Sequence, residues 1–260
     1  MHENEFILQL GQYAELVERI SDCLTSDGRY SEAEVLYSKL MRINQEKKSY
    51  EHPDTLGSMA NLASTYWNQG RWNEAEKVEV QVLETRSRIL GPEHPDTLTS
   101  MANLASTYWN QGRWNEAERL KAQVLDVRRR ILGPEHPHTL TSMANLASTY
   151  QNQGRWNEAE KVEVQVLETR SRILGPEHPD TLSSMHNLAY TYNSMGRNTE
   201  ASDLMTQCAT LRARNIGSTH PDTLSSSDAL TEWQKLDHHG SLRPGKGRRL
   251  KALKCVFGFK

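Results

Sequence analysis

The sequence predicts an all-α fold, a solenoid of antiparallel helix hairpins with a 42-residue period, and two observations support this prediction. The dipeptide His-Pro recurs at residues 52, 94, 136, 178 and 220, always 42 residues apart. The central units are near copies, because residues 94–135 match residues 52–93 at 34 of 42 positions and residues 136–177 match them at 39 of 42. A fixed period of this length is typical of units that stack on their neighbours.

The first helix of each unit is expected to begin at the proline of the His-Pro pair and to run for about 17 residues. Proline suits the first turn because its φ is fixed and its missing N–H would be unpaired there. In residues 52–93 the apolar positions that share one face of this helix are Leu56, Met59, Leu62, Ala63 and Tyr66. Gly70 then permits the left-handed conformation that ends a helix.

The second helix is expected to start near Trp72, to run for about 19 residues and to stop at Gly91-Pro92. Its expected buried face consists of Ala75, Val78, Val82, Leu83 and either Ile89 or Leu90. One such hairpin cannot cover the apolar surface of both helices, so the core is expected to run continuously through the stacked units.

The repeat divides the chain into a cap, an array, a second cap and a tail. Residues 1–51 form a degenerate first unit, and their polar residues favour an N-terminal cap; alternatively, their first helix packs on something upstream. Ile20 takes the place of Leu62 in this unit. Four repeats follow at 52–93, 94–135, 136–177 and 178–219. Residues 220–236 are expected to form a C-terminal capping helix, and residues 237–260 a basic, disordered tail.

The order of large, Leu, small, Tyr, Gly, Ala and Pro positions resembles the tetratricopeptide repeat, and the residues that carry it are Met59, Leu62, Ala63, Tyr66, Gly70, Ala75 and Pro95. The 42-residue length and the segments NLA, EAE and LGPEHPDT resemble the kinesin-light-chain type of this repeat. The same type is found in the C-terminal arrays of fungal NOD-like receptor proteins. The resemblance covers about residues 10–236 and implies a right-handed solenoid whose first helices line a concave groove.

Composition indicates a reducing compartment and no membrane span. The three cysteines, Cys23, Cys208 and Cys255, are odd in number and far apart, which argues against a disulfide framework. The N-terminus lacks the features of a secretory signal, and no apolar run is long enough to span a bilayer, so the expected location is cytoplasmic. Residues 242–260 contain seven Lys and Arg and no acid, so a net charge of −2 leaves the remaining residues at about −9.

Polar and aromatic residues recur on the face of the first helix opposite Leu62 and Tyr66, and the resemblance implies that they point into the groove. The predicted partner-binding residues are Asn61, Ser64, Trp67 and Asn68; Asn103, Ser106, Trp109 and Asn110; Asn145, Ser148, Gln151 and Asn152; and Asn187, Tyr190 and Asn193. A carboxamide donates and accepts hydrogen bonds, so a ladder of four asparagines could hold the backbone of an extended peptide. By resemblance, asparagines at this place in kinesin light chain bind cargo peptides. Alternatively, they bond the neighbouring helix and hold the stack.

The near-identical copies differ at one of these predicted groove positions. Trp67 and Trp109 occupy it in two units, and Gln151 and Asn193 occupy it in the next two. An aromatic residue on a binding face is a common interface anchor. The alternatives are drift after duplication and packing of the tryptophans on the adjacent hairpin.

Other chemistry is poorly supported by the sequence. The five recurring histidines belong to separate layers of the stack, which favours a junction or capping role over a metal site. Residues 240–247 nearly fit a phosphate loop, but Gly247 replaces the hydroxyl residue and no strand precedes the motif. No cofactor, metal or small-molecule substrate is predicted, and no catalytic arrangement of Ser, His, Asp or Cys has a plausible scaffold.

These observations predict a non-catalytic scaffold that binds a peptide or partner protein in the groove. The resemblance favours a sensor-type array like that of fungal NOD-like receptors, because such arrays have nearly identical internal copies. A cargo adaptor like kinesin light chain is the alternative, although residues 1–50 show no sustained heptads for a motor subunit. A further alternative is weak, salt-dependent binding of nucleic acid or an anionic membrane through the basic tail.

Overall fold

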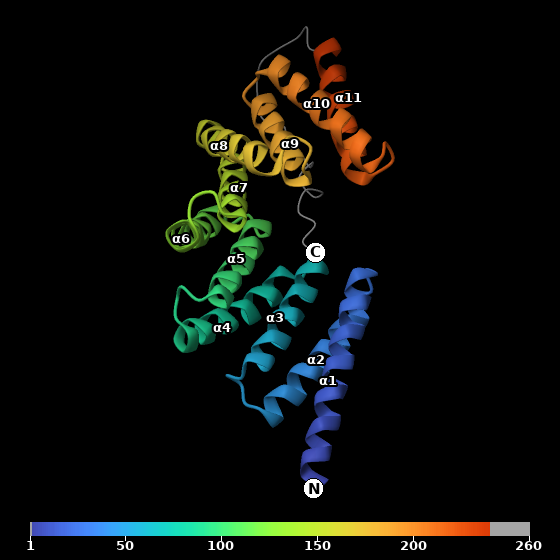
Figure 1. The fold of residues 1–260 in the computed structure, drawn as a ribbon, viewed down its shortest axis with the longest axis vertical. Helices are drawn as coiled ribbons and strands as arrows, with labels where there is room; N and C mark the ends of the chain where they lie inside the picture. Colours follow the sequence, from blue (N-terminus) through green and yellow to red (C-terminus); the bar gives the residue numbers. More distant parts are fainter. Residues whose placement is uncertain (1, 240–260) are drawn as a thin grey trace. The chain divides into compact units, whose positions relative to one another are not determined.

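The computed structural model describes residues 2–239, and all regular elements in that range are α-helices (Figure 1). The helices are α1 (His2–Ser26), α2 (Tyr30–Lys47), α3 (Pro53–Asn68), α4 (Trp72–Leu90), α5 (Pro95–Asn110), α6 (Trp114–Leu132), α7 (Pro137–Asn152), α8 (Trp156–Leu174), α9 (Pro179–Ser194), α10 (Asn198–Ile216) and α11 (Pro221–His239). The predicted all-α hairpin repeat is therefore confirmed. No described helix is both long and apolar enough to cross a bilayer.

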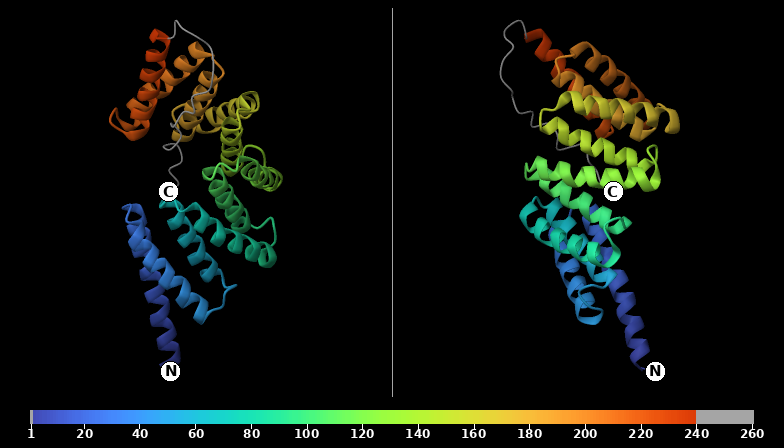
Figure 2. Two further views of the ribbon diagram at one scale, coloured as in Figure 1. Left: turned by 180° about the vertical axis from the view of Figure 1, so that it is seen from behind. Right: turned by 90° about the vertical axis from the view of Figure 1, so that its left-hand side faces the viewer.

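The described residues divide into two compact units, one on each side of the boundary between residues 131 and 132. In the first unit, α2 packs on α1 and α3, and α4 packs on α3 and α5 (Figure 2). In the second unit, α8 packs on α7 and α9, and α10 packs on α9 and α11. Each of these second helices therefore covers the first helix of its own hairpin and the first helix of the next one.

The recurring histidines cap the first helices. Nδ1 of His52 accepts a hydrogen bond from the backbone N–H of Asp54 at 3.2 Å. Equivalent bonds of 3.1–3.2 Å are made by His94, His136, His178 and His220. An acceptor at this place satisfies one of the N–H groups that the first turn of a helix leaves without an intrahelical partner. The predicted capping role of the histidine row is therefore confirmed.

The turns of three hairpins, α3–α4, α5–α6 and α9–α10, tie each of them to the hairpin before it. Gly70 has a φ of 75°, which ends α3 in the left-handed region. Arg71 follows it, forms an ion pair with Glu74 of its own helix and donates to Glu34 of α2 at 2.7 Å. Its guanidinium carbon also lies 4.3 Å from the centre of the Tyr66 ring, a cation–π distance. The turn arginines that repeat this arrangement are Arg113 and Arg197.

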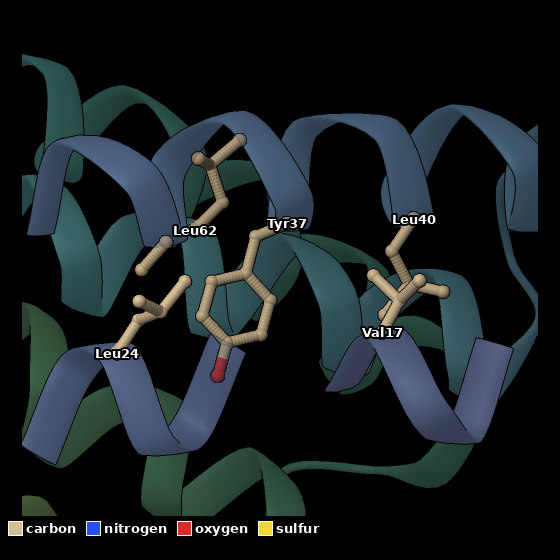
Figure 3. Close-up of a cluster of buried hydrophobic side chains, with 6 residues drawn as sticks. Val17, Leu24, Tyr37, Leu40 and Leu62 are labelled. Carbon is tan, nitrogen blue, oxygen red and sulfur yellow. The ribbon is translucent and has the colours of Figure 1, made fainter. Parts of the chain in front are cut away.

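The first helices bury the face that the sequence predicts. The buried residues of α3 include Leu56, Met59, Leu62 and Ala63. In Figure 3, Leu62 of α3 lies with Tyr37 and Leu40 of α2 and with Val17 and Leu24 of α1. This cluster joins the first hairpin to the second, so the core continues from one hairpin into the next, as the repeat requires.

The second helices depart from the predicted buried face. Ala75 and Val82 are buried as expected, but Ile89 and Leu90 are 44% and 38% exposed. A 19-residue helix is about 4–5 Å longer than the 16-residue helices on which it packs, so its last residues extend past them. A charged residue, Glu79, lies between the two buried apolar positions with only 7% of its surface exposed.

Both ends of the described chain also differ from prediction. Ile20 was expected to match the buried Leu62 but is 43% exposed, because α2 covers Leu62 whereas no described helix lies ahead of α1. Helix α11 continues to His239 instead of ending at residue 236, since no Gly or Pro interrupts it before Gly240. The basic segment, Cys255 and the near match to a phosphate loop lie outside the described residues.

Replacing His94 by alanine is expected to lower the free energy of unfolding by about 1 kcal/mol, because the N–H of Asp96 loses its acceptor. His94→Asn keeps a side-chain acceptor at the same place and should retain most of the stability. Urea denaturation followed by circular dichroism measures both variants. An equal loss in the two variants would show that the imidazole contributes by packing and not by capping.

Candidate partner-binding surface

Four asparagines occupy equivalent places on α3, α5, α7 and α9, and the helix face that carries them is termed the asparagine face. Asn103 is exposed, whereas Asn61, Asn145 and Asn187 are half-buried. Nδ2 of Asn61 donates to Glu18 of α1 over a long 3.4 Å, so this residue does contact a neighbouring helix. The side chains of Asn103 and Asn187 make no hydrogen bond within the described residues.

The predicted residues near the ends of these helices bond to their own backbone. The amides of Asn68, Asn110 and Asn152 donate to the carbonyl oxygens of Ser64, Ser106 and Ser148 at 2.8–2.9 Å. Such bonds satisfy carbonyl groups that the last turn of a helix leaves unpaired. Ser64 is exposed and Ser106 half-buried, but Ser148 is buried, so its predicted place on a binding surface is wrong. Asn193 is half-buried.

Gln151 is buried between helices, which corrects its predicted place on the groove. Its side chain is 8% exposed, and Nε2 donates to Glu163 at 2.8 Å and to Thr191 at 2.7 Å. The hydroxyl of Thr191 donates to the other oxygen of Glu163 at 2.6 Å. A buried carboxylate requires hydrogen-bond donors. The carboxamide of Gln151 on α7 supplies one to Glu163 on α8 and also donates to Thr191 on α9. Gln151, Glu163 and Thr191 are termed the matching cluster.

Tyr190 also packs inward, against prediction. Its ring centre lies 4.9 Å from that of His186, and 5.3 Å from that of Trp233 in an edge-to-face contact. The equivalent residue in the earlier units is a serine, which cannot make these contacts. The larger ring therefore contributes to the packing of α9 against α11, and Tyr190 packs, partly buried, against the core of the second unit.

In the first unit, the positions equivalent to the matching cluster hold Trp67 of α3, Glu79 of α4 and Thr107 of α5, which are termed the inner cluster. Trp67 is half-buried. Its Nε1, Oε2 of Glu79 and Oγ1 of Thr107 are buried and make no hydrogen bond within the described residues. The exchange of a carboxamide for an indole therefore leaves three polar atoms without partners.

Burial determines the protonation of these carboxyl groups. It raises the pKa of Glu79 to about 7, and the nearby Thr107 hydroxyl offsets part of that rise. Burial also raises the pKa of Glu163 to about 7. Burial therefore favours the neutral form of both carboxyl groups, because the charged form loses its hydration inside the fold.

Trp109 is half-buried and differs from Trp67 in the charge beside it. The ammonium group of Lys121 lies 5.9 Å from its ring centre, at the outer limit of a cation–π contact. Lys121 occupies the position of Glu79 and Glu163 in its own repeat. Burial lowers the pKa of Lys121 to about 7. The near-identical repeats therefore vary the charge next to the Trp/Gln position while keeping the surrounding packing residues.

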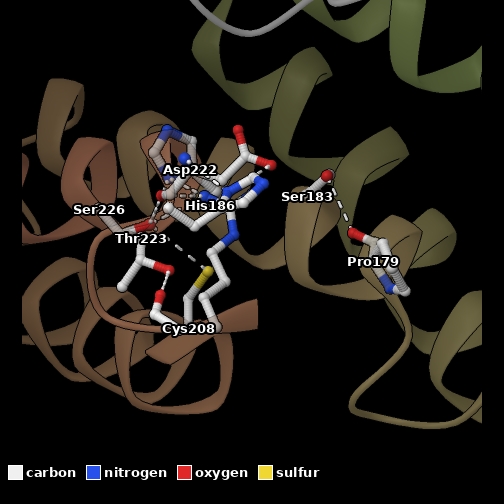
Figure 4. A network of polar contacts seen from close by, with 10 residues as sticks. Pro179, Ser183, His186, Cys208, Asp222, Thr223 and Ser226 are labelled. Carbon is white, nitrogen blue, oxygen red and sulfur yellow. Dashed lines mark hydrogen bonds and ion pairs between the residues drawn. The ribbon is translucent and has the colours of Figure 1, made fainter. Parts of the chain in front are cut away.

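A buried polar network in α9, α10 and α11 was missed from the sequence (Figure 4). Arg212 donates to the hydroxyl of Ser226 at 2.9 Å, and Nδ1 of His186 lies 3.2 Å from the same hydroxyl. The thiol of Cys208 donates to the Leu182 carbonyl at 3.2 Å. Burial and the Arg212 charge lower the pKa of His186 to about 3, and burial raises the pKa of the Cys208 thiol.

This network contributes to packing in the second unit. His186 and Cys208 are 1% and 0% exposed, and the neutral forms of both are favoured, so they offer neither access nor a thiolate to a substrate. The feature of the sequence that could have indicated this network is that the fourth full repeat departs from the residues that the earlier repeats share. His186 replaces the alanine of MANLA, and Cys208 replaces a valine that the three earlier repeats share.

A family model described as tetratricopeptide repeat matches residues 12–86, 57–126, 100–170 and 144–214. The chain belongs to the tetratricopeptide repeat family. A solved structure of a putative kinesin light chain with nearly identical TPR-like repeats, from Podosopora anserina, is 33% identical with a TM-score of 0.67. The match covers 79% of this chain and 96% of that chain. No curated protein matches the sequence.

More distant tetratricopeptide repeat structures share the fold alone. BtubC (BKLC) from P. vanneervenii is 21% identical with a TM-score of 0.68, and the match covers 82% of this chain and 85% of that chain. A signal transduction ATPase with numerous domains and a tetratricopeptide repeat sensor, from Pyrococcus horikoshii, is 14% identical with a TM-score of 0.65. That match covers 86% of this chain and 33% of the other.

The raised pKa of Glu79 predicts a pH-dependent effect on stability. Because the folded pKa of about 7 exceeds the ordinary value of 4.5, the folded state holds this proton more tightly, and stability falls as the pH rises from about 4.5 to 7. Glu79→Gln cannot ionise, so its stability relative to the native chain should increase over that range, by about 1–3 kcal/mol.

Urea denaturation at pH 4.5, 6 and 8 measures this difference. Glu84→Gln, at an exposed position on the same helix, is the matched control and should show no such trend. A stability difference for Glu79→Gln that stays constant with pH would contradict the assignment.

Proposed function

We propose that this tetratricopeptide repeat protein is a non-catalytic scaffold that binds a partner protein through extended segments lying on the asparagine face of each unit. The observation that supports this function most directly is Asn103, which is exposed and has no hydrogen bond within the described residues. An amide in this state can donate to one peptide carbonyl and accept from one peptide N–H without giving up a bond inside the fold.

The packing beneath this face favours binding without rearrangement. Leu104 and Ala105, the residues after Asn103, are buried against α6. Arg113, in the turn that follows α5, is bonded to Glu76 of the preceding second helix at 2.7 Å. A helix held on two sides keeps its free amide in place, which lowers the entropy lost on binding.

The sensor-type setting is preferred for this scaffold. It is supported by the near identity of residues 52–93 and 136–177, by the relative with nearly identical TPR-like repeats, and by the shared fold of a protein with a tetratricopeptide repeat sensor. The same relative is described as a putative kinesin light chain, and this favours a cargo adaptor as the second candidate. The free thiols of Cys23 and Cys208 are consistent with the cytoplasmic location proposed here.

The double substitution Asn103→Ala and Asn187→Ala should abolish partner capture while leaving the fold intact, because neither side chain bonds to the described structure. Proximity labelling in the native cell, followed by affinity capture with quantitative mass spectrometry, identifies the partners that depend on the two amides. The expected result is at least about a tenfold loss for a defined set of proteins, as removal of two or more hydrogen bonds implies.

Asn157→Ala provides the matched control, since Asn157 is an exposed asparagine in the first turn of α8 and not on the asparagine face. It should capture the same partners as the native chain. If the double variant keeps all of them with unchanged affinity, the asparagine face is not the binding surface.

A further inference from the structure

The inner cluster contains three buried polar atoms that make no well-formed hydrogen bond within the described residues, although the Thr107 hydroxyl is close enough to Glu79 to offset part of the rise in its pKa. They are the indole N–H of Trp67, Oε2 of Glu79 and Oγ1 of Thr107, contributed by α3, α4 and α5. Glu79 is 7% exposed and Thr107 is fully buried. Leaving such groups unpaired is costly, and native proteins do so rarely, so this cluster requires an explanation.

The second unit shows which chemical group fits at these positions. In the matching cluster, the carboxamide of Gln151 donates to both Glu163 and Thr191, at 2.8 and 2.7 Å. Residues 52–93 and 136–177 differ at only three positions, and the exchange of Trp67 for Gln151 is one of them. The first unit therefore keeps the carboxyl and hydroxyl groups that hold an amide but lacks the amide itself.

We propose that the inner cluster is a binding site for a primary carboxamide, supplied by an asparagine or glutamine side chain of the bound partner. This inference rests on the proposed function, because Trp67 is half-buried on α3, the helix that also carries Asn61. A peptide on the asparagine face passes the indole, and a rotation of that side chain that keeps its N–H directed at the cluster gives the amide access to Glu79 and Thr107 without any shift of the helices.

The donors and acceptors of this site match a carboxamide. Trp67 offers one N–H donor, while Glu79 and Thr107 each offer an acceptor oxygen. A primary amide has one carbonyl oxygen to accept from the indole and two N–H groups to donate to the oxygens. A carboxylate ligand has no donor and is repelled by an ionised Glu79, and an alkylammonium ligand has no acceptor for the indole N–H.

Nuclear magnetic resonance of the full chain, labelled with nitrogen-15, tests the site with acetamide as the probe. The Trp67 indole signal and the Thr107 backbone amide should shift together and saturate with one dissociation constant. N,N-dimethylacetamide has the same carbonyl group but no N–H, so it should bind at least about tenfold more weakly, since two hydrogen bonds are lost. Acetate should produce no saturable shift.

Two variants test whether acetamide binds at the inner cluster. Trp67→Gln introduces the residue found at 151, which should fill the site from within, and acetamide should no longer shift the Thr107 amide. Thr107→Val removes one acceptor with little change in volume, and it should weaken the response of the Trp67 indole by about three- to tenfold. The Thr107→Val variant keeps the test valid if Trp67→Gln does not fold.

Three results would overturn the inference. They are equal binding of acetamide and N,N-dimethylacetamide, a retained response in Trp67→Gln, and the absence of any saturable response, which would mean that water alone occupies the cluster. The asparagine-face variants test the proposed function separately. Loss of partner capture in those variants together with no acetamide response would reject the carboxamide site and leave the scaffold function standing.

Discussion

Helices α3 and α9 are each buried on two sides, by the second helix of their own hairpin and by the second helix of the hairpin before it. Helix α3 shows both contacts, because Leu62 packs on α2 whereas Leu56 and Met59 pack with Val82 of α4. Only the remaining side of such a helix is available for binding. The proposed binding surface, the asparagine face, is inferred to be that side. Any change that shifts a second helix therefore also shifts the surface that the first helices present.

Polar bonds give this stack its register, since apolar contacts alone are not directional. Arg86 of α4 donates to the hydroxyl of Ser100 on α5 at 2.9 Å, and Arg170 of α8 makes the same contact with Ser184 of α9 at 3.0 Å. Burial lowers the pKa of both arginines, yet each bonds to neutral oxygens and remains charged. One second helix therefore binds the next hairpin at a defined height along the helix axis.

The sequence was sufficient for the regular part of this fold and insufficient for its polar interior. Leu56, Leu62 and Ala63 lie at helical spacing, and their burial follows from hydrophobicity and period alone. Glu79 is also buried, but a search for apolar residues at helical spacing does not select a glutamate, so its burial was not predicted. The histidine caps were predictable because the helix start was defined by an adjacent proline.

Two of the corrected site residues show why a surface position is harder to predict than a core position. Gln151 and Trp67 share one place in the repeat, and the glutamine points inward because Glu163 and Thr191 provide buried partners for its amide. Tyr190 points inward because its ring packs edge to face on Trp233 of α11. In both cases the direction in which the side chain points depends on residues about 12 to 43 positions away in the sequence. The helical period of the residue's own helix contains no information about those residues.

The inner and matching clusters show how a repeat array can change its chemistry without changing its fold. The backbone of the repeat is held by caps, turn arginines and apolar faces that residues 52–93 and 136–177 share. The residue at position 67 or 151 then determines whether the buried carboxyl group beside it receives a hydrogen bond from the protein itself. Where it is satisfied, the bond adds to the stability of the unit. Where it is not, the cost of the unpaired groups becomes free energy that a ligand with the right donors can recover, so in this repeat stability and binding depend on the same three side chains.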